Sequence, residues 1–388
     1  MSRAYIPLSV PNLKGNELKY VTDAVETEWV SSGGSYINAF EETFAQFVKV
    51  DDAVAVQSGT AALHLALMEV GVEYGEEVLA PTLTFIAAVN PIRYCGAEPV
   101  FFDCDDSLCL DPIKLDQFLE QECTYEDGIV RNKATNKRIR AIVVVHVFGN
   151  MADMASIMPI AHKYQLKVIE DATEALGTTY TEGVYSGKLA GTIADIGAYS
   201  FNGNKIMTTG GGGMLVSNNK QYLDHMRYLS TQAKDDLINF VHGEVGYNYR
   251  MTNLQGALGL GQIEQLSTFI ETKERNYRLY SELLRECQQC SILPFREGTK
   301  PNFWFYSLYL SSEENIQVKM DALQLKRIQT RPIWGLMHEQ KPYLKNQSYQ
   351  IEKAEHYAKH IINIPCSTNL LEEDVRYVVQ SIKKIFGE

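Results

Sequence analysis

The sequence has few cysteines and no long apolar run. Its seven cysteines are an odd number scattered between Cys95 and Cys366, which argues against a disulfide framework and favours a reducing compartment. No stretch reaches the roughly 18 consecutive apolar residues of a membrane span, and the N-terminus has no apolar core of a signal peptide. We therefore expect a cytoplasmic protein that neither crosses a membrane nor carries a secretion signal.

Basic residues are also fewer than acidic residues. Lysine and arginine number 36 against 48 aspartates and glutamates, which gives a formal net charge of −12 over 388 residues. Because an acidic chain repels phosphate backbones, we expect no nucleic-acid partner. Cys287 and Cys290 form a close pair in a helical pattern, but no second pair stands at zinc spacing, so no metal site is expected. No Gly-x-Gly-x-x-Gly segment follows a first strand, which argues against a nicotinamide oxidoreductase.

Short, continuous apolar runs alternate with helical patterns over the first two thirds of the chain. Continuous apolar strands are typical of a sheet covered on both faces, and helices between them indicate parallel crossovers. This pattern predicts an α/β fold with a large, doubly wound, mostly parallel sheet in a domain over residues 1–253. The predicted strands lie at residues 53–56, 78–80, 98–103, 139–148, 166–170, 193–201 and 214–217.

The character of the sequence changes after residue 253. One long helix is predicted over residues 254–285, leading into a smaller C-terminal α+β domain over 254–388. That domain should contain a strand near 303–309 and a terminal helix at 372–386. The polar, turn-rich segment 121–138 predicts a protruding hairpin or loop within the first domain.

Two polar signals follow apolar strands of the predicted sheet. Ser58, Gly59 and Thr60 stand at a helix N-terminus, where backbone N–H groups can bind a phosphate or where the hydroxyls simply cap the helix. Asp171 directly follows a strand, so its carboxylate lies at the rim of the binding crevice. It could pair with a protonated ring nitrogen, or it could cap the next helix.

Two further signals lie in loops. Lys205 precedes a run of four glycines that ends at Gly213, which indicates either an unusual backbone path near a ligand or a flexible surface loop with a solvated lysine. Asn248 and Arg250 lie in the turn GYNYRM, where Arg250 is equally compatible with a structural ion pair. His146, at a strand end, is expected to support the site indirectly or to be a satisfied buried histidine.

Six segments then stand in a fixed order along the chain. They are QSGTAALHLAL from Gln57, APTLTFIA from Ala80, VHVFGN from Val145, IEDATEALGT from Ile169, SFNGNKIMTTGGGG from Ser200 and GYNYRMTNLQGALGLGQ from Gly246. With these segments the chain resembles, over nearly its whole length, the DegT/DnrJ/EryC1/StrS family of sugar aminotransferases. These enzymes depend on pyridoxal 5'-phosphate (PLP) and have the fold type I, or aspartate aminotransferase-like, architecture.

The resemblance implies a role for each matching position. Lys205 would form the Schiff base with PLP, Asp171 would keep the pyridine nitrogen protonated, and Phe85 would stack on one ring face. Asn248 would reach the phosphate from a neighbouring subunit, which implies a homodimer with shared active sites. The other implied phosphate ligands are Gly59, Thr60 and Ser200.

The sequence departs from the family pattern at two positions. Gly211 stands where the family usually has an acidic residue, and Glu174 stands where many members have glutamine. The resemblance implies that Glu174 contacts the cofactor's ring hydroxyl or the amine. It also suggests nucleotide-sugar contacts, some of which are equally compatible with core or solvated positions. These candidates are Trp29, Val30, Ser31, Ser32, Tyr199, Arg331, Trp334 and His338.

The segments SFNGNK and EDATEALG and the extra hairpin near Tyr125 are similar to those of the subgroup that acts on UDP-4-keto-6-deoxy-N-acetylhexosamines. Enzymes of that subgroup act in bacillosamine and legionaminic acid synthesis. The implied reaction moves an amino group from L-glutamate to the C4 ketone of UDP-2-acetamido-2,6-dideoxy-4-ketohexose, with ping-pong kinetics. The alternatives are a 3-aminotransferase, a dTDP- or GDP-4-keto-6-deoxyhexose aminotransferase and a non-catalytic PLP-binding regulator. A PLP-dependent sugar dehydratase would have histidine in place of Lys205.

Overall fold

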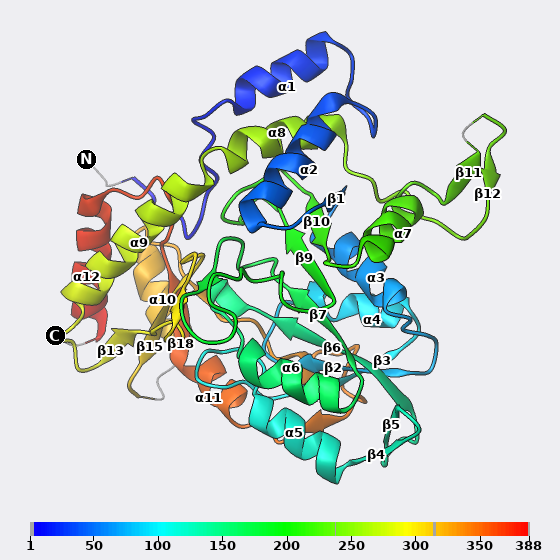
Figure 1. Cartoon of the computed structure of the whole chain (residues 1–388). Helices are drawn as coiled ribbons and strands as arrows, with labels where there is room; N and C mark the ends of the chain where they lie inside the picture. The colour runs from blue at the N-terminus through cyan, green and yellow to red at the C-terminus, as the bar shows by residue number, and fades with distance from the viewer. Residues whose placement is uncertain (1–3, 237, 313–315, 387–388) are drawn as a thin grey trace.

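A large mixed sheet forms the centre of the molecule (Figure 1). The computed structural model describes residues 4–236, 238–312 and 316–386, over which ten strands join in this sheet. The main path runs β1-β10-β9-β7-β6-β2-β3-β17, and the hairpin β4–β5 is attached to it through β5 and β6. The strands are β1 (Ala53–Val56), β2 (Glu77–Pro81), β3 (Glu98–Phe102), β4 (Cys123–Glu126), β5 (Ile129–Asn132), β6 (Arg138–Val145), β7 (Lys167–Asp171), β9 (Ile196–Ser200), β10 (Gly213–Val216) and β17 (Ser348–Tyr349).

The predicted α/β fold with a mostly parallel sheet is confirmed. Neighbours from β9 through β7, β6, β2 and β3 to β17 all pair in parallel. Every residue of β1, β2 and β10 is buried, as expected for strands covered on both faces. The predicted hairpin at 121–138 is also confirmed, as β4 and β5.

On the main path of the sheet, β10 runs against the other strands. β10 pairs antiparallel with both β1 and β9, so a parallel crossover is not present between β9 and β10. The reason is that a loop, and no helix, joins these two consecutive strands, and a direct return produces an antiparallel pair. This loop, residues 201–212, carries Lys205.

Helices surround the sheet. α3 packs against β7, β9 and β10, whereas α6 packs against β7. The β11–β12 hairpin (Lys234–Asp236 and Val241–His242) extends away from the body beyond α7 (Figure 1). No helix among the described residues is long and apolar enough to cross a membrane. The helices of this part are α1 (Glu17–Glu26), α2 (Ser35–Val48), α3 (Gly59–Glu69), α4 (Asn90–Tyr94), α5 (Pro112–Gln121), α6 (Met154–Lys163) and α7 (Lys220–Ser230).

The C-terminal part builds a second, antiparallel sheet in the order β13-β15-β18-β16. The strand predicted near 303–309 corresponds to β15, and the terminal helix predicted at 372–386 corresponds to α12. The division of the chain at residue 253 stays a prediction. The elements of this part are β13 (Cys290–Ile292), β15 (Tyr306–Leu310), β16 (Arg331–Pro332), β18 (Ile361–Ile364), α10 (Ile316–Leu325), α11 (Lys353–His360) and α12 (Glu372–Phe386), and a small ribbon pairs β8 (Thr179–Tyr180) with β14 (Thr299–Lys300).

The single long helix predicted over 254–285 is wrong. The segment forms α8 (Asn253–Ile263) and α9 (Leu266–Leu283), which are interrupted at Glu264 and Gln265. α8 packs against α1 and α2, whereas α9 packs against α12, so the two halves are held by different neighbours. At the break, the Glu264 carboxylate accepts hydrogen bonds from Asn16 and Tyr20, each at 2.7 Å.

The helical position predicted for the cysteine pair is also wrong. α9 ends at Leu283, so Cys287 lies after the helix and Cys290 begins β13. Their sulfur atoms are 3.2 Å apart, a hydrogen-bond contact between two thiols.

Candidate active site

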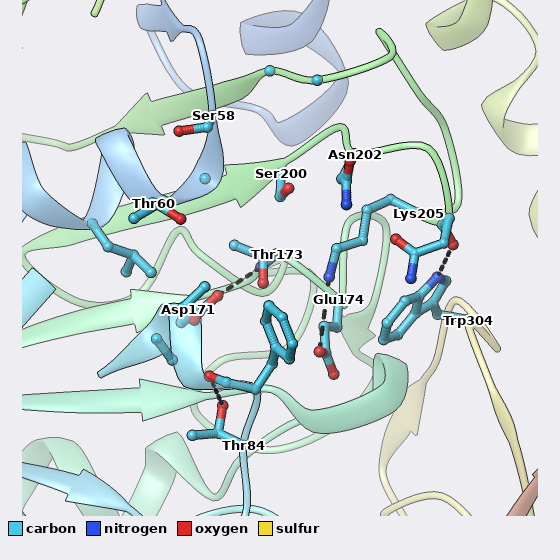
Figure 2. A pocket seen from close by; sticks show the side chains of 18 of the residues that line it. Ser58, Thr60, Thr84, Asp171, Thr173, Glu174, Ser200, Asn202, Lys205 and Trp304 are labelled. Carbon is cyan, nitrogen blue, oxygen red and sulfur yellow. Dashed lines mark hydrogen bonds and ion pairs between the residues drawn. The ribbon is translucent and has the colours of Figure 1, made fainter. Parts of the chain in front are cut away.

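A cavity of about 400 Å³ lies where β7 and β9 end. The carboxyl ends of parallel strands are where ligands bind in such sheets. Eight of the residues to which the resemblance gives a role line this cavity, and Figure 2 shows most of them pointing into it. They are Gly59, Thr60, Phe85, Asp171, Glu174, Ser200, Lys205 and Trp334.

The amine of Lys205 is buried inside this cavity. Its Nζ lies 3.8 Å from Oε1 of Glu174 and 4.2 Å from the centre of the Trp304 indole ring. Burial lowers the pKa of Lys205, and the negative charges of Glu174 and Asp171 oppose that shift. A lysine with a lowered pKa has a larger fraction of neutral, nucleophilic amine near pH 7.

Asp171 approaches the cavity from the side opposite to Lys205 (Figure 2). It is the last residue of β7, is 2% exposed, and accepts a hydrogen bond from the Thr173 backbone N–H at 3.0 Å. Burial raises the pKa of its carboxyl group, whereas the hydrogen bonds from Thr173 and the charge of Lys205 lower it. A buried carboxylate in this position is suited to pair with a cationic ligand group, such as a protonated ring nitrogen.

Glu174 is a second buried carboxyl group in the same cavity. Its Oε2 accepts the Phe148 backbone N–H at 2.8 Å, which leaves Oε1 on the side of Lys205. Burial raises the pKa of Glu174 to about 7, against the opposing charge of Lys205. Glu174 can therefore hold or release a proton beside the amine near neutral pH.

The start of α3 lies against the end of β9. Ser58 caps α3 by accepting the Ala61 N–H at 3.1 Å, so the capping role considered for this segment is real. Gly59 is required for the close approach, because a Cβ there would lie 2.8 Å from Cβ of Ser200. The positive end of the α3 dipole thus meets the cavity beside Thr60 and Ser200, an arrangement that suits a phosphate.

The glycine run follows an unusual backbone path. Gly210 and Gly212 have φ values of +77° and +152°, which favour glycine. A Cβ on Gly213 would lie 2.6 Å from the backbone of Ser58. Gln255 fixes the loop by donating to the carbonyl of Gly211 at 2.6 Å. The flexible-loop interpretation of this segment is therefore wrong.

The remaining predicted residues lie outside the cavity. Tyr199 is fully buried, and its hydroxyl donates to the Ala190 carbonyl at 2.7 Å, so its assignment as a sugar contact is corrected to a core position. His338 Nδ1 shares a hydrogen bond with the Thr82 hydroxyl at 2.7 Å. Those on the surface are Trp29, Val30, Ser31, Ser32, Asn248 and Arg331.

Two other residues are structural. His146 is buried and satisfied, with Nε2 2.9 Å from Glu170 and Nδ1 accepting the Ala152 N–H, as expected from its strand-end position. Arg250 forms an ion pair with the buried Glu41.

The sequence reasoning missed several residues that line the cavity. The most prominent is Trp304, which lies in the aromatic segment PNFWFYSLYL that reads simply as a buried strand. No local signal separates it from its core neighbours, because only the folded chain brings residue 304 to the Lys205 loop. The others are Thr84, Thr173, Asn202 and Asn204.

Comparisons with known proteins identify the family and the fold. Residues 11–383 match the model of the DegT/DnrJ/EryC1/StrS aminotransferase family. GDP-perosamine synthase of Escherichia coli O157:H7 is 36% identical over 99% of each chain. UDP-4-amino-4,6-dideoxy-N-acetyl-beta-L-altrosamine transaminase of Campylobacter jejuni is 28% identical over 98% of this chain and 97% of that protein. The PLP form of Spr1654, a putative sugar aminotransferase of Streptococcus pneumoniae, superposes with a TM-score of 0.87 at 22% identity over 98% of each chain, which confirms the fold.

The burial of Lys205 predicts how its reactivity depends on pH. Only a neutral amine is acylated, so the midpoint of a rate-against-pH curve reports the pKa. In the cofactor-free chain we expect Lys205 to react with acetic anhydride with a midpoint below the ordinary value of 10.5. Glu174→Gln should lower the midpoint further, because it removes a charge that favours the ammonium form. Peptide mass spectrometry over a pH series measures both, and an upward shift in Glu174→Gln would contradict the electrostatic account.

Proposed function

The chain belongs to the DegT/DnrJ/EryC1/StrS aminotransferase family, and from that premise we propose that it transfers an amino group from L-glutamate to the C4 ketone of a nucleotide-linked 6-deoxy sugar. At the coarser level, it is a PLP-dependent sugar aminotransferase of glycan biosynthesis. The observation that supports amino transfer at this site is the arrangement of Lys205 and Asp171 on opposite sides of one cavity.

The residues of the cavity fit PLP. A buried amine and a buried carboxylate face each other across it, and the α3 N-terminus approaches so closely that only glycine fits at position 59. We propose that Lys205 holds the cofactor covalently, that Asp171 pairs with the ring nitrogen and that half-exposed Phe85 lies against the ring face. The proposed phosphate ligands in this chain are Gly59, Thr60 and Ser200.

PLP, when bound, supplies an electron sink for negative charge that develops on the carbon bearing the amino group. The protein contributes a proton carrier and a fixed electrostatic environment. Lys205, whose pKa burial lowers, can take a proton from that carbon as a general base and deliver it as a general acid to the carbon on the other side of the nitrogen. Asp171 stabilises positive charge on the ring nitrogen, and Glu174 holds a proton beside the amine or contacts the ring hydroxyl. Because the amino donor and the keto sugar react one after the other in the same site, the proposal predicts ping-pong kinetics.

The nucleotide is the least constrained part of the proposal. The segment phrasing of the sequence favours a UDP-linked N-acetylhexosamine, as does the name of the 28% identical transaminase, which also specifies a 4-amino sugar. The 36% identical relative is named for a GDP-linked sugar. We propose a GDP-linked 4-keto-6-deoxyhexose as the first candidate and the UDP-linked sugar as the second, because the higher identity extends over the whole chain. Trp334 supports a sugar site in the cavity, since its ring lies 5.3 Å from that of Phe85.

A substrate panel tests this function. The PLP-loaded chain is mixed with L-glutamate and GDP-, UDP- or dTDP-linked 4-keto-6-deoxy sugars, and the products are analysed by NMR. We expect an amine at C4, formed fastest from the GDP sugar, and a loss of about 10²-fold or more in Lys205→Ala because the general base is gone. Turnover of a 3-keto isomer added to the panel, without turnover of the 4-keto sugars, would contradict the regiochemistry, and PLP binding without turnover of any sugar would favour a non-catalytic regulator.

We propose that Asn248 completes the phosphate site of a second copy of the chain. Asn248 is exposed and lies apart from its own cavity. It follows the β11–β12 hairpin, which extends from the body (Figure 1) and carries exposed apolar side chains. Ile238 and Val245 are 85% and 80% exposed. Contiguous exposed apolar groups of this kind mark interaction sites, which supports a homodimer with shared active sites.

Mixing two inactive variants tests the shared site. Lys205→Ala and Asn248→Asp chains are unfolded together, refolded and assayed. If the sites are shared, each mixed dimer holds one intact site, so roughly a quarter of the wild-type activity should return after random pairing. Each variant refolded alone is the control. No recovery in verified mixed dimers would place both groups in one chain and contradict the shared site.

A further inference from the structure

Trp304 contacts the Lys205 loop at two points. Its indole N–H donates to the Asn204 carbonyl at 2.8 Å, next to Lys205 in the chain. Its ring face lies 4.2 Å from the Lys205 Nζ. Trp304 therefore fixes both the backbone from which the lysine side chain starts and the amine at which it ends, as Figure 2 shows.

Trp304 is itself held firmly. It is 1% exposed, and its ring stacks on Phe305 at 4.0 Å with an interplanar angle of 11°. Its backbone N–H donates to Oδ1 of Asn302 at 2.9 Å, and its carbonyl accepts from Nζ of Lys273 at 3.0 Å. These contacts hold the Trp304 ring in one position, so the Lys205 side chain must take the rotamer that reaches the ring face.

The same asparagine ties Trp304 to Glu174. The side-chain amide of Asn302 donates to the carbonyls of Glu174 and Leu176, each at 3.0 Å. Glu174 and Trp304 are the two groups that flank the amine, at 3.8 and 4.2 Å. Asn302 thus couples both walls of the space in which the amine lies.

An aromatic face attracts a cation, most strongly for tryptophan and most effectively away from water. Burial disfavours the ammonium form of Lys205, whereas the indole face and the Glu174 carboxylate favour it. A lysine chain with four rotatable carbons otherwise samples many rotamers. The pair of walls therefore selects one rotamer for the protonated amine.

We propose that Trp304 is a positioning residue whose ring face holds the protonated Lys205 amine beside Glu174 whenever that amine is not covalently bound. Once protonated, the amine then delivers its proton from one fixed place. This inference rests on the proposed function only in giving Lys205 a free state during turnover. The contacts of the Lys205 amine with Trp304 and Glu174 are present without substrate.

The test compares variants of the cofactor-free full chain in the acylation assay of Lys205 against pH. Trp304→Phe keeps an aromatic face with a weaker attraction, and Trp304→Leu removes it. The midpoint of the acylation rate against pH should be highest in the wild type, lower in Trp304→Phe and lowest in Trp304→Leu. Each substitution removes more of the attraction that stabilises the ammonium form. Phe85→Leu is the matched control, since Phe85 lines the same cavity. It should leave the midpoint unchanged.

A second measurement covers the case in which Trp304→Leu fails to fold. The chain is produced with 5-fluorotryptophan in a Trp334→Phe background, so that Trp304 is the only tryptophan lining the described cavity. Fluorine weakens the attraction of the ring face for a cation while preserving the hydrogen bond to Asn204. The midpoint should fall relative to the same variant with ordinary tryptophan, with an unchanged thermal unfolding curve.

Equal midpoints with fluorinated and ordinary tryptophan would overturn the proposal and leave Trp304 a purely structural residue. If the acylation midpoints fall in the expected order but the chain aminates no keto sugar, the positioning role of Trp304 is supported and the proposed function is refuted. The two claims therefore fail separately.

Discussion

The site depends on one physical constraint, which is that a lysine amine buried in a cavity needs partners for its positive charge. Burial disfavours the ammonium form of Lys205, and the neighbouring Glu174 carboxylate and Trp304 ring oppose that effect. The balance leaves the pKa of Lys205 below its ordinary value, which increases the fraction of neutral amine available as a base or nucleophile. Asp171 lies across the cavity and supplies the second charge that an aromatic cofactor with a basic ring nitrogen requires.

The fold provides this arrangement through two irregularities in an otherwise parallel sheet. Because β9 returns directly to β10, the intervening loop projects Lys205 into the crevice in place of a helix. The glycines of that loop then allow β10 to pass close to the start of α3. The C-terminal part contributes Trp304 and Trp334 to the cavity lining, with Trp304 beside Lys205. The cavity is therefore assembled from segments far apart in the sequence, and a change in the packing of the second sheet would alter the environment of the amine.

Much of this could be predicted from the sequence, because continuous apolar runs mark buried strands and polar residues at their ends mark the crevice. This pattern singles out Lys205 and Asp171 as candidates, and the resemblance to the family then implies the role of each. The direction of β10 was not predicted, since a four-residue apolar run carries no information on orientation. Tyr199 was misassigned because side chains alternate along a strand. Its neighbour Ser200 faces the cavity, so Tyr199 faces the core. The break at Glu264 and the role of Trp304 depend on contacts with distant segments.

The central claim is that Lys205 is the residue that binds PLP covalently. Lys273 offers an internal comparison, because it is also buried with a lowered pKa, yet it donates to the carbonyls of Trp304 and Cys366 and does not line the cavity. The most direct measurement loads the chain with PLP, reduces the covalent link with borohydride and maps the labelled peptide by mass spectrometry. The account predicts a single label on Lys205. A label on Lys273 or on a surface lysine, with Lys205 unmodified, would contradict it.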